Sequence, residues 1–433
     1  MNSSTQTPPA ILGGPKSVTL DQHDAKRWPL LSEEDERAVL KVLRNGDLSF
    51  DPVTRELEAD YRRYFGARHA LAHCNGTAAL LAAFFALDLQ PGDEVLVPSA
   101  TFWASVVPML WVGAVPVFCE SEFDRLGLDP EDAERKITSR TRAMVVTHLW
   151  GMPAKMTELT ALARRHNLRI IEDASHAQGA MWRGRPCGTL GDLSIFSLQS
   201  SKLAPAGEGG MLLTNDEALM ERAICLGDIE RIRELQTPAM RFAATSFGIK
   251  TRMAPLSAAV AQVQLRRLEQ RNAERNESLE YLSERLETLG FETYSAPAHI
   301  QRVYFEFVFR CGKAQASLSR QKLVEALRAE GCDVSLPRYP LLHQQPLFTE
   351  GTWVKIARVE EALKREYCVD ALPRTARVND ELLRMPAFPR ATRKLMDQYA
   401  EAFEKVMENA ELIASLSPRE RAPRSGGLGM FRA

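Results

Sequence analysis

Short apolar runs alternate with helix-like segments through the first half of the chain, and this alternation is the strongest constraint on the fold. Strand–helix–strand order predicts parallel strands joined by helical crossovers, and therefore an α/β domain. In sheets of this kind, ligands bind at the carboxyl ends of the strands. The sequence predicts strands at 94–98, 113–118, 143–148 and 169–173, with a helix at 154–166 between the last two.

The α/β pattern occupies only part of the 433 residues, so we expect a division into segments. Residues 1–18 and 417–433 are rich in proline, glycine and polar residues and are expected to be disordered. Residues 19–270 are expected to form the large α/β domain, and residues 271–416 a smaller α+β domain. A single long helix over 254–289 is expected to carry the chain from one domain into the other.

The overall composition excludes several classes of protein. The 55 basic and 56 acidic residues nearly balance, so no global field draws the chain to nucleic acid. No apolar run is long enough for a transmembrane helix, and the polar N-terminus lacks the apolar core of a signal peptide. Seven cysteines without a CxxC pair indicate neither a metal site nor a disulfide framework. We therefore expect a cytoplasmic protein with no membrane partner and no metal.

Lys202 lies between an apolar strand at 193–196 and a small, glycine-rich run at 206–210. A poorly solvated amine in such a position is what a carbonyl cofactor needs for covalent attachment. The alternative is an ordinary lysine on a surface loop.

Two further features accompany this lysine. Asp173 ends an apolar strand, where a carboxylate needs a cation or several donors; its alternative role is a helix cap or a structural anchor. Gly76, Thr77 and Ala78 open a helix after another apolar run. Free N–H groups at a helix start bind anions, although an ordinary capped helix has the same pattern.

Together with Phe102, His176 and Ser197, these residues form a set suited to pyridoxal 5'-phosphate. The phosphate of that cofactor needs N–H donors, and its ring needs a stacking face. Its pyridine nitrogen needs a carboxylate, and its aldehyde needs a lysine.

The chain resembles the sugar and cyclitol aminotransferases of the DegT/DnrJ type, which have the fold type I of aspartate aminotransferase. The resemblance extends over about residues 28–412 and implies a large, mostly parallel mixed sheet with a smaller C-terminal domain. The stretches that carry it are 73–80, 91–102, 113–118, 172–180, 196–202 and 207–210.

The resemblance implies roles for individual residues. Lys202 matches the lysine that binds the cofactor and transfers a proton, and Asp173 matches the partner of the pyridine nitrogen. The remaining cofactor contacts that it implies are the ring neighbours Phe102 and His176 and the phosphate contacts Gly76, Thr77, Ala78 and Ser197.

Four positions carry weaker implications. Gln199 matches a glutamine of family members that act on cyclitols. Trp150 matches a position in the loop beneath the cofactor, and its alternative role is packing. His343, in the segment 338–343, matches a stretch that approaches substrate or is a surface histidine. Lys250 stands where the family has an asparagine that reaches the phosphate of the neighbouring subunit; its alternative role is a solvated loop lysine.

The resemblance therefore implies a homodimeric aminotransferase that moves an amino group from glutamate or glutamine to a keto-sugar or keto-cyclitol, in amino sugar or antibiotic biosynthesis. A dehydratase or aromatising enzyme acting on an amino-shikimate-like carbocycle is an alternative. Related dehydratases carry histidine at the lysine position, so Lys202 argues against simple dehydration. A non-catalytic regulator that keeps the fold is a further alternative.

Overall fold

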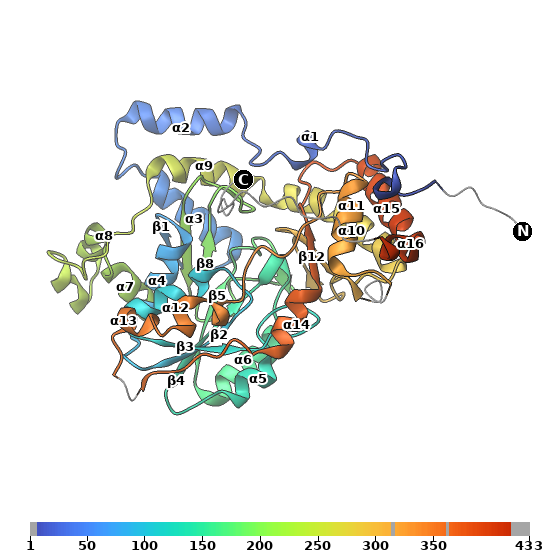
Figure 1. The fold of residues 1–433 in the computed structure, drawn as a ribbon. Coiled ribbons are helices and arrows are strands. Elements are labelled where there is room, and N and C mark those ends of the chain that lie inside the picture. The colour runs from blue at the N-terminus through green and yellow to red at the C-terminus, as the bar shows by residue number, and fades with distance from the viewer. Residues whose placement is uncertain (1–6, 313–316, 361–362, 417–433) are drawn as a thin grey trace, which may run out of the picture.

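A seven-stranded sheet forms the centre of the computed structural model, which describes residues 7–312, 317–360 and 363–416 (Figure 1). The strand order is β1-β9-β8-β5-β4-β2-β3. β9 is antiparallel to its neighbours β1 and β8, and the other pairs are parallel. This arrangement confirms the mostly parallel, mixed sheet. The strands are β1 (His69–His73), β2 (Glu94–Pro98), β3 (Val115–Cys119), β4 (Thr141–Thr147), β5 (Arg169–Asp173), β8 (Leu193–Ser197) and β9 (Gly210–Thr214).

Helices cover both faces of this sheet, which is why its strands read as continuous apolar runs. On β2, Val95 and Val97 pack into one core, whereas Leu96 between them packs into the opposite one. One face carries α4 and α7, and the other carries α3, α5, α6 and α9. The helices of this domain are α3 (Val53–Phe65), α4 (Gly76–Ala86), α5 (Pro130–Arg135), α6 (Met156–His166), α7 (Glu217–Cys225), α8 (Ile229–Glu234) and α9 (Pro255–Arg266).

A second core lies beside the sheet domain and is built around a two-stranded antiparallel sheet. Its aromatic centre includes Phe307, Phe309 and Phe403. It appears at the right of Figure 1 and is formed by β11 (Phe307–Arg310), β12 (Leu382–Met385), α10 (Leu268–Thr288), α11 (Arg320–Ala329), α15 (Arg393–Glu408) and α16 (Ala410–Ser415).

The N-terminal segment packs on this second core, so the expectation of disorder over 1–18 is wrong for residues 7–18. A 3-10 helix, η1 (Ala10–Leu12), lies there, and the backbone N–H groups of Ala10 and Ser17 donate to the buried Glu330 carboxylate. The Val18 side chain is buried in the core itself. Residues 1–6 and 417–433 lie outside the described residues.

Residues 342–360 and 363–372, here called the 342–372 segment, differ from the expected division, because they return to the large domain. Phe348 and Trp353 are buried in the same core as Leu110 and Phe118. The Phe348 ring packs edge-on against Phe118 of β3, with ring centroids 4.9 Å apart. The segment contains η7 (Leu342–Gln344), α12 (Pro346–Thr349) and α13 (Trp353–Ala357), and α14 (Pro373–Glu381) follows it.

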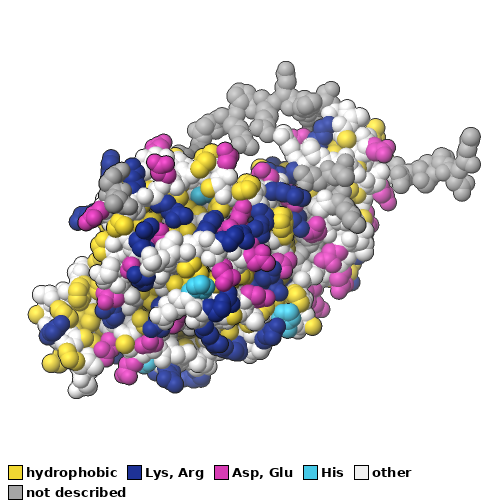
Figure 2. Space-filling view, turned by 90° about the horizontal axis from the view of Figure 1, so that it is seen from below, with side chains coloured by type: hydrophobic (Ala, Val, Ile, Leu, Met, Phe, Trp, Pro, Cys, Tyr) yellow, Lys and Arg dark blue, Asp and Glu magenta, His cyan; other side chains and the backbone are white. Residues whose placement is uncertain are grey.

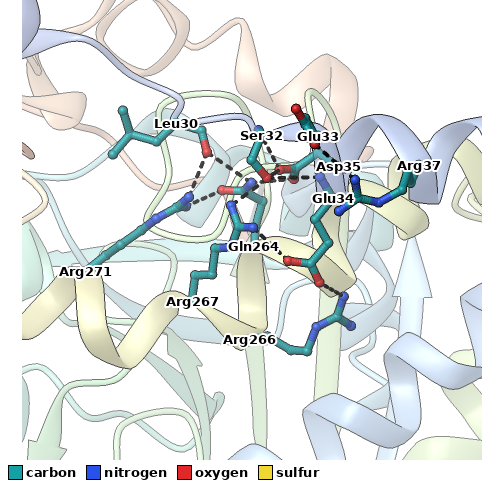
Figure 3. A network of polar contacts seen from close by, with 10 residues as sticks. All are labelled: Leu30, Ser32, Glu33, Glu34, Asp35, Arg37, Gln264, Arg266, Arg267 and Arg271. Carbon is teal, nitrogen blue, oxygen red and sulfur yellow. Dashed lines mark hydrogen bonds and ion pairs between the residues drawn. The ribbon is translucent and has the colours of Figure 1, made fainter.

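The long helix expected over 254–289 is interrupted at Arg267, which separates α9 from α10. This junction holds the start of α2 (Glu33–Asn45), which lies across α9 (Figures 1 and 3). Glu34 accepts from Arg266 and Arg267, each at 2.7 Å, and Asp35 accepts from Gln264 at 2.6 Å.

The shorter elements are α1 (His23–Lys26), β6 (Met181–Trp182), β7 (Arg185–Pro186), β10 (Ile300–Gln301), η2 (Trp103–Ser105), η3 (Val107–Val112), η4 (Leu149–Gly151) and η5 (Pro238–Phe242).

Acidic and basic side chains are interspersed over the face drawn in Figure 2, in keeping with a formal net charge of -1. Within the described parts of the chain, no helix has both the length and the apolar character needed to cross a bilayer.

Candidate active site

Lys202 lies in the turn that follows β8 and is only 9% exposed. Its backbone N–H donates to the Gln199 carbonyl at 2.8 Å, which closes the turn. Its Nζ atom lies 4.6 Å from the centroid of the Phe305 ring. Burial lowers the pKa of the Lys202 amine to about 8, although the nearby Asp173 carboxylate opposes this shift. Burial therefore makes the neutral, nucleophilic form of this amine more accessible near neutral pH than in an exposed lysine.

Asp173 ends β5, beside β8, and its side chain is fixed by two donors. The Ser105 hydroxyl donates to Oδ2 at 2.6 Å, and the Ser175 N–H donates to Oδ1 at 3.1 Å. Each carboxylate oxygen can accept a second hydrogen bond. Asp173 is thus oriented and still able to receive a proton donor such as a pyridinium. Ser105 carries no signal in the sequence, because only the fold brings it beside Asp173 at the end of β5.

The preceding residue, Glu172, holds the loop that follows this strand. Its carboxylate is fully buried and accepts from the backbone N–H groups of Gly188, Leu190 and Gly191. His148, also fully buried, lies 2.8 Å from the same carboxylate through Nε2. These contacts fix the backbone next to Asp173, and a rigid support of this kind keeps a functional side chain oriented.

His176 is neutral, and its tautomer is defined by its surroundings. The Trp150 backbone N–H donates to His176 Nδ1 at 3.3 Å, so the ring proton lies on Nε2. Burial lowers the pKa of His176 well below its ordinary value. The Nε2 atom lies 3.3 Å from the Tyr339 hydroxyl. His176 therefore offers one N–H donor toward the interior of the site.

The rings of Trp150, His176, Phe305 and Tyr339 form a set of nearly parallel planes, here called the aromatic wall. The His176 and Phe305 ring centroids are 3.9 Å apart with 7° between their planes, and those of Trp150 and Tyr339 are 5.1 Å apart with 8°. Trp150 has a positive φ of 58°, an uncommon backbone conformation for a bulky residue. Such strain occurs where packing fixes a functional group.

Phe102 lies beside this wall. Its ring centroid is 5.8 Å from that of Tyr339, and the two planes are tilted by 51°. The ring is half-buried, and its neighbour Trp103 is exposed. Phe102 therefore keeps a ring face available near the start of η2, as a stacking role requires.

The start of α4 meets the end of β8 at very close range. A Cβ atom on Gly76 would lie 2.8 Å from Ser197 Cβ, so a glycine is needed for this approach. Asn75 caps the helix, and the Ala78 N–H donates to its side chain at 2.8 Å. Gly76 and Thr77, which open the helix, are the better candidates for anion donors, with the Ser197 hydroxyl beside them.

These features fit pyridoxal phosphate. The glycine-dependent cradle at Gly76 and Ser197 suits the phosphate, Asp173 suits the pyridine nitrogen, and the His176 N–H suits the ring oxygen. Lys202 would supply the amine for the aldehyde. Within the described residues, no group of three or more His, Cys, Asp or Glu side chains is arranged to hold a metal ion.

Two residues expected near substrate have hydrogen-bond partners within the fold. His343 is 1% exposed, and its Nδ1 lies 2.7 Å from the Ser99 hydroxyl, while its Nε2 lies 3.1 Å from the Val369 carbonyl. Both ring nitrogens of His343 are therefore engaged within the fold, and its burial contradicts the alternative of a surface histidine. The Gln199 carbonyl oxygen accepts from both the N–H and the hydroxyl of Ser201, which stabilises the Lys202 turn.

Lys250 lies on an exposed stretch of the loop before α9. The following residue, Thr251, is bound to the end of β1: its hydroxyl lies 2.8 Å from His73 Nδ1, and its carbonyl accepts from the Cys74 N–H at 2.6 Å. This loop is therefore attached to the segment that leads into Asn75 and Gly76. A contact between Lys250 and a cofactor stays a prediction.

The structure adds three charged residues at the small-domain side of this site, namely Glu306, Arg338 and Arg384. Glu306 is 4% exposed, and one of its oxygens accepts from both arginines. Only the 338–343 segment carried a signal in the sequence, because the three residues come from separate parts of the chain.

Comparison with known proteins places these features in a family. A model of the DegT/DnrJ/EryC1/StrS aminotransferase family matches residues 29–402. A predicted L-glutamine:3-amino-2,3-dideoxy-scyllo-inosose aminotransferase of Micromonospora echinospora is 35% identical over 357 residues, which cover 80% of this chain and 84% of that protein.

Two further relatives extend the comparison. The L-glutamine:2-deoxy-scyllo-inosose aminotransferase of Streptomyces kanamyceticus is 32% identical over 407 residues, covering 90% of this chain and 95% of that protein. The crystal structure of 3-amino-5-hydroxybenzoic acid synthase matches with a TM-score of 0.76 at 26% identity, covering 88% of this chain and 98% of that one.

Proposed function

The chain belongs to the DegT/DnrJ/EryC1/StrS aminotransferase family, and from this premise we propose that it transfers an amino group from L-glutamine to a keto-cyclitol. It is a pyridoxal-phosphate-dependent aminotransferase, as the family match and the set of Lys202, Asp173 and His176 together indicate. The observation that carries the proposal is the buried Lys202 amine, held beside Asp173 with a lowered pKa.

Pyridoxal phosphate, when bound, supplies two groups: an aldehyde, which takes up and returns an amino group, and a ring, which delocalises negative charge. Lys202 would bind the aldehyde, and its neutral amine would then accept the α-proton of the donor. Asp173 would hold the proton on the pyridine nitrogen, and His176 would donate its Nε2 proton to the ring oxygen. Gly76, Thr77 and Ser197 would hold the phosphate.

A keto-cyclitol acceptor is supported by the relatives and by the surfaces beside Lys202. The names of the two relatives above give scyllo-inosose compounds as acceptors. The aromatic wall offers flat apolar faces to the C–H bonds of a six-membered carbocycle, and Glu306 and Arg338 offer polar groups to its hydroxyls. We accordingly propose a role in the biosynthesis of an amino sugar or aminocyclitol secondary metabolite.

An aromatising reaction on an amino-shikimate-like carbocycle is a second candidate. It is favoured by the structural similarity to 3-amino-5-hydroxybenzoic acid synthase. Both functions need the same cofactor and the same lysine, so the acceptor distinguishes them.

We also propose that the enzyme is a homodimer with its site at the subunit interface. Met240, Phe247 and Ile249 are 52%, 50% and 42% exposed and come from one stretch of chain next to Lys250. Figure 2 shows hydrophobic side chains gathered at the end of the molecule that carries α8. A second subunit would cover this apolar surface and would bring Lys250 toward the phosphate cradle of its neighbour.

All seven cysteines are free, which supports a reducing cytoplasm as the location of the enzyme.

The acceptor is tested by amination of a panel of ketones. We expect the holoenzyme with L-glutamine to aminate 2-deoxy-scyllo-inosose or a related keto-cyclitol at least about tenfold faster, in kcat/KM, than nucleotide-linked keto-sugars. The measurement is formation of the aminated product, followed by mass spectrometry. Preferential use of a keto-sugar, or conversion of an amino-shikimate-like ketone to an aromatic product, would contradict the assignment.

A further inference from the structure

Glu306 lies at the centre of a charged cluster on the small-domain side of the site. It comes directly before β11, Arg384 comes from β12, and Arg338 comes from the segment that leads to η7. Its Oε1 atom accepts from Arg338 Nε at 2.9 Å, from Arg338 Nη2, and from Arg384 Nη1 at 3.0 Å. All three hydrogen bonds of the cluster therefore converge on one of the two carboxylate oxygens.

The other oxygen, Oε2, is buried and has no hydrogen-bond partner among the described residues. The side chain as a whole is 6% exposed, so bulk water does not solvate this atom. A buried, charged acceptor without a donor is destabilising, and such atoms are rare in native structures. A donor from outside the chain that reached Oε2 would complete the cluster.

The cluster is close to the reacting groups. Both Glu306 and Arg338 act electrostatically on the Lys202 amine, and Arg338 also acts on His176. The Arg338 guanidinium carbon lies 5.9 Å from the centroid of the Phe305 ring, and the Lys202 Nζ lies 4.6 Å from the same centroid. A substrate bound next to Lys202 therefore lies within reach of the Glu306 carboxylate.

We propose that Glu306 selects L-glutamine over L-glutamate by accepting a hydrogen bond from the donor's side-chain carboxamide at Oε2. This inference rests on the proposed amino transfer and deepens it. A primary carboxamide has two N–H donors and no charge, so it satisfies the orphaned oxygen. The side-chain carboxylate of glutamate has no donor and would place a second negative charge against Glu306.

The arginines complete the recognition of the donor. Arg338 and Arg384 each use part of their donor set on Glu306, and a guanidinium has five N–H groups. The Arg338 side chain is 42% exposed and can turn its remaining N–H groups toward the α-carboxylate of the amino acid. The negative charge of Glu306 also neutralises the positive charge of one of the two arginines. The side-chain carboxylate of glutamate therefore gains little electrostatic attraction from this pair.

Glu306→Gln tests the assignment, because it keeps the size of the side chain and removes its charge. Arg338 and Arg384 donate only, so the new carboxamide must turn its oxygen to them and its N–H groups toward the substrate. We expect wild-type protein to prefer glutamine by about a hundredfold in kcat/KM, and the variant to lose this preference to within about tenfold of unity. The readout is the half-reaction of the holoenzyme with each amino acid.

A binding measurement makes the test independent of turnover. Glutaramate carries the side-chain carboxamide of glutamine, and glutarate carries the side-chain carboxylate of glutamate. Both compounds lack the reacting amine. Calorimetry with wild-type holoenzyme should show glutaramate binding at least about tenfold more tightly. Equal binding of the two compounds would overturn the inference, even if Glu306→Gln failed to fold.

The matched control is Glu381→Gln. Glu381 is also a largely buried glutamate between two arginines, Arg310 and Arg377. We expect this variant to keep the wild-type preference for glutamine. A Glu306→Gln protein with an unchanged preference would overturn the role of Glu306. If neither amino acid reacts with the holoenzyme, the proposed function fails, and the calorimetric comparison still decides the inference.

Discussion

Lys202→Ala is expected to abolish amino transfer, with a fall in turnover of about 10⁶-fold. Among the described residues, the variant removes the amine that lies buried, with a lowered pKa, near Asp173 and the aromatic wall. The group that attaches the cofactor and the base that accepts the donor's α-proton are lost together. The measurement is amination of the keto-cyclitol with L-glutamine at saturating pyridoxal phosphate.

Lys202→Arg separates charge from nucleophilicity at the same position. A guanidinium keeps its proton at all accessible pH values, so it cannot act as nucleophile or base. We expect it to be as inactive as Lys202→Ala. Lys136→Ala is the control: this lysine donates to the Phe118 carbonyl and pairs with Asp132 at 2.8 Å, and its loss should leave the rate within about threefold. Full turnover by either Lys202 variant would refute the assignment.

Asp173→Asn is expected to lower kcat by about 10³-fold, which corresponds to about 4 kcal/mol of transition-state stabilisation. The amide has nearly the same shape and can still contact Ser105 and Ser175. It carries no charge, so it does not hold a proton on the pyridine nitrogen, and the ring becomes a poorer acceptor of electrons. The measurement is the single-turnover rate with L-glutamine.

The same experiment includes a control for structural damage. Asp192 accepts the Ile170 N–H at 2.8 Å and pairs with Arg169 at the opposite end of β5. Asp192→Asn should leave the single-turnover rate within about threefold of the wild-type value. Cofactor content should remain near wild type in Asp173→Asn, because Lys202 and the phosphate cradle are intact. An unchanged rate in Asp173→Asn would show that this carboxylate does not support the chemistry.

Local sequence patterns predicted the parts of the site that lie at strand ends. Asp173 follows two buried isoleucines, and Lys202 lies in a turn between two strands, so each could be placed from its own neighbours. Gly76 could be singled out because it lies where an apolar run changes to a helix. The order of these features along the chain then identified the family.

Contacts between distant segments could not be read in this way. His343 looked like a substrate residue, yet it connects the 342–372 segment to Ser99, a contact between parts of the chain far apart in sequence. The same segment was expected in the small domain, because its helices carry no mark of the surface on which they pack. Ser105 and Glu306 acquire their importance only from partners in other elements.

The N-terminal segment shows the same limit. Its prolines and glycines indicated disorder, whereas residues 7–18 pack on the small domain through Glu330. Composition describes how readily a segment becomes ordered by itself. Hydrogen bonds to a buried carboxylate elsewhere in the chain stabilise the ordered state of this segment.

Reduction of the holoenzyme with borohydride, followed by peptide mass spectrometry, tests the central claim most directly. Borohydride converts the bond between a lysine and the cofactor aldehyde to a stable amine, so the modified residue can be identified. We expect one phosphopyridoxyl group per chain, on the peptide that contains Lys202. Its loss after prior incubation with L-glutamine would show that the cofactor had taken up the donor's amino group. Modification of a different lysine, or none, would contradict the site described above.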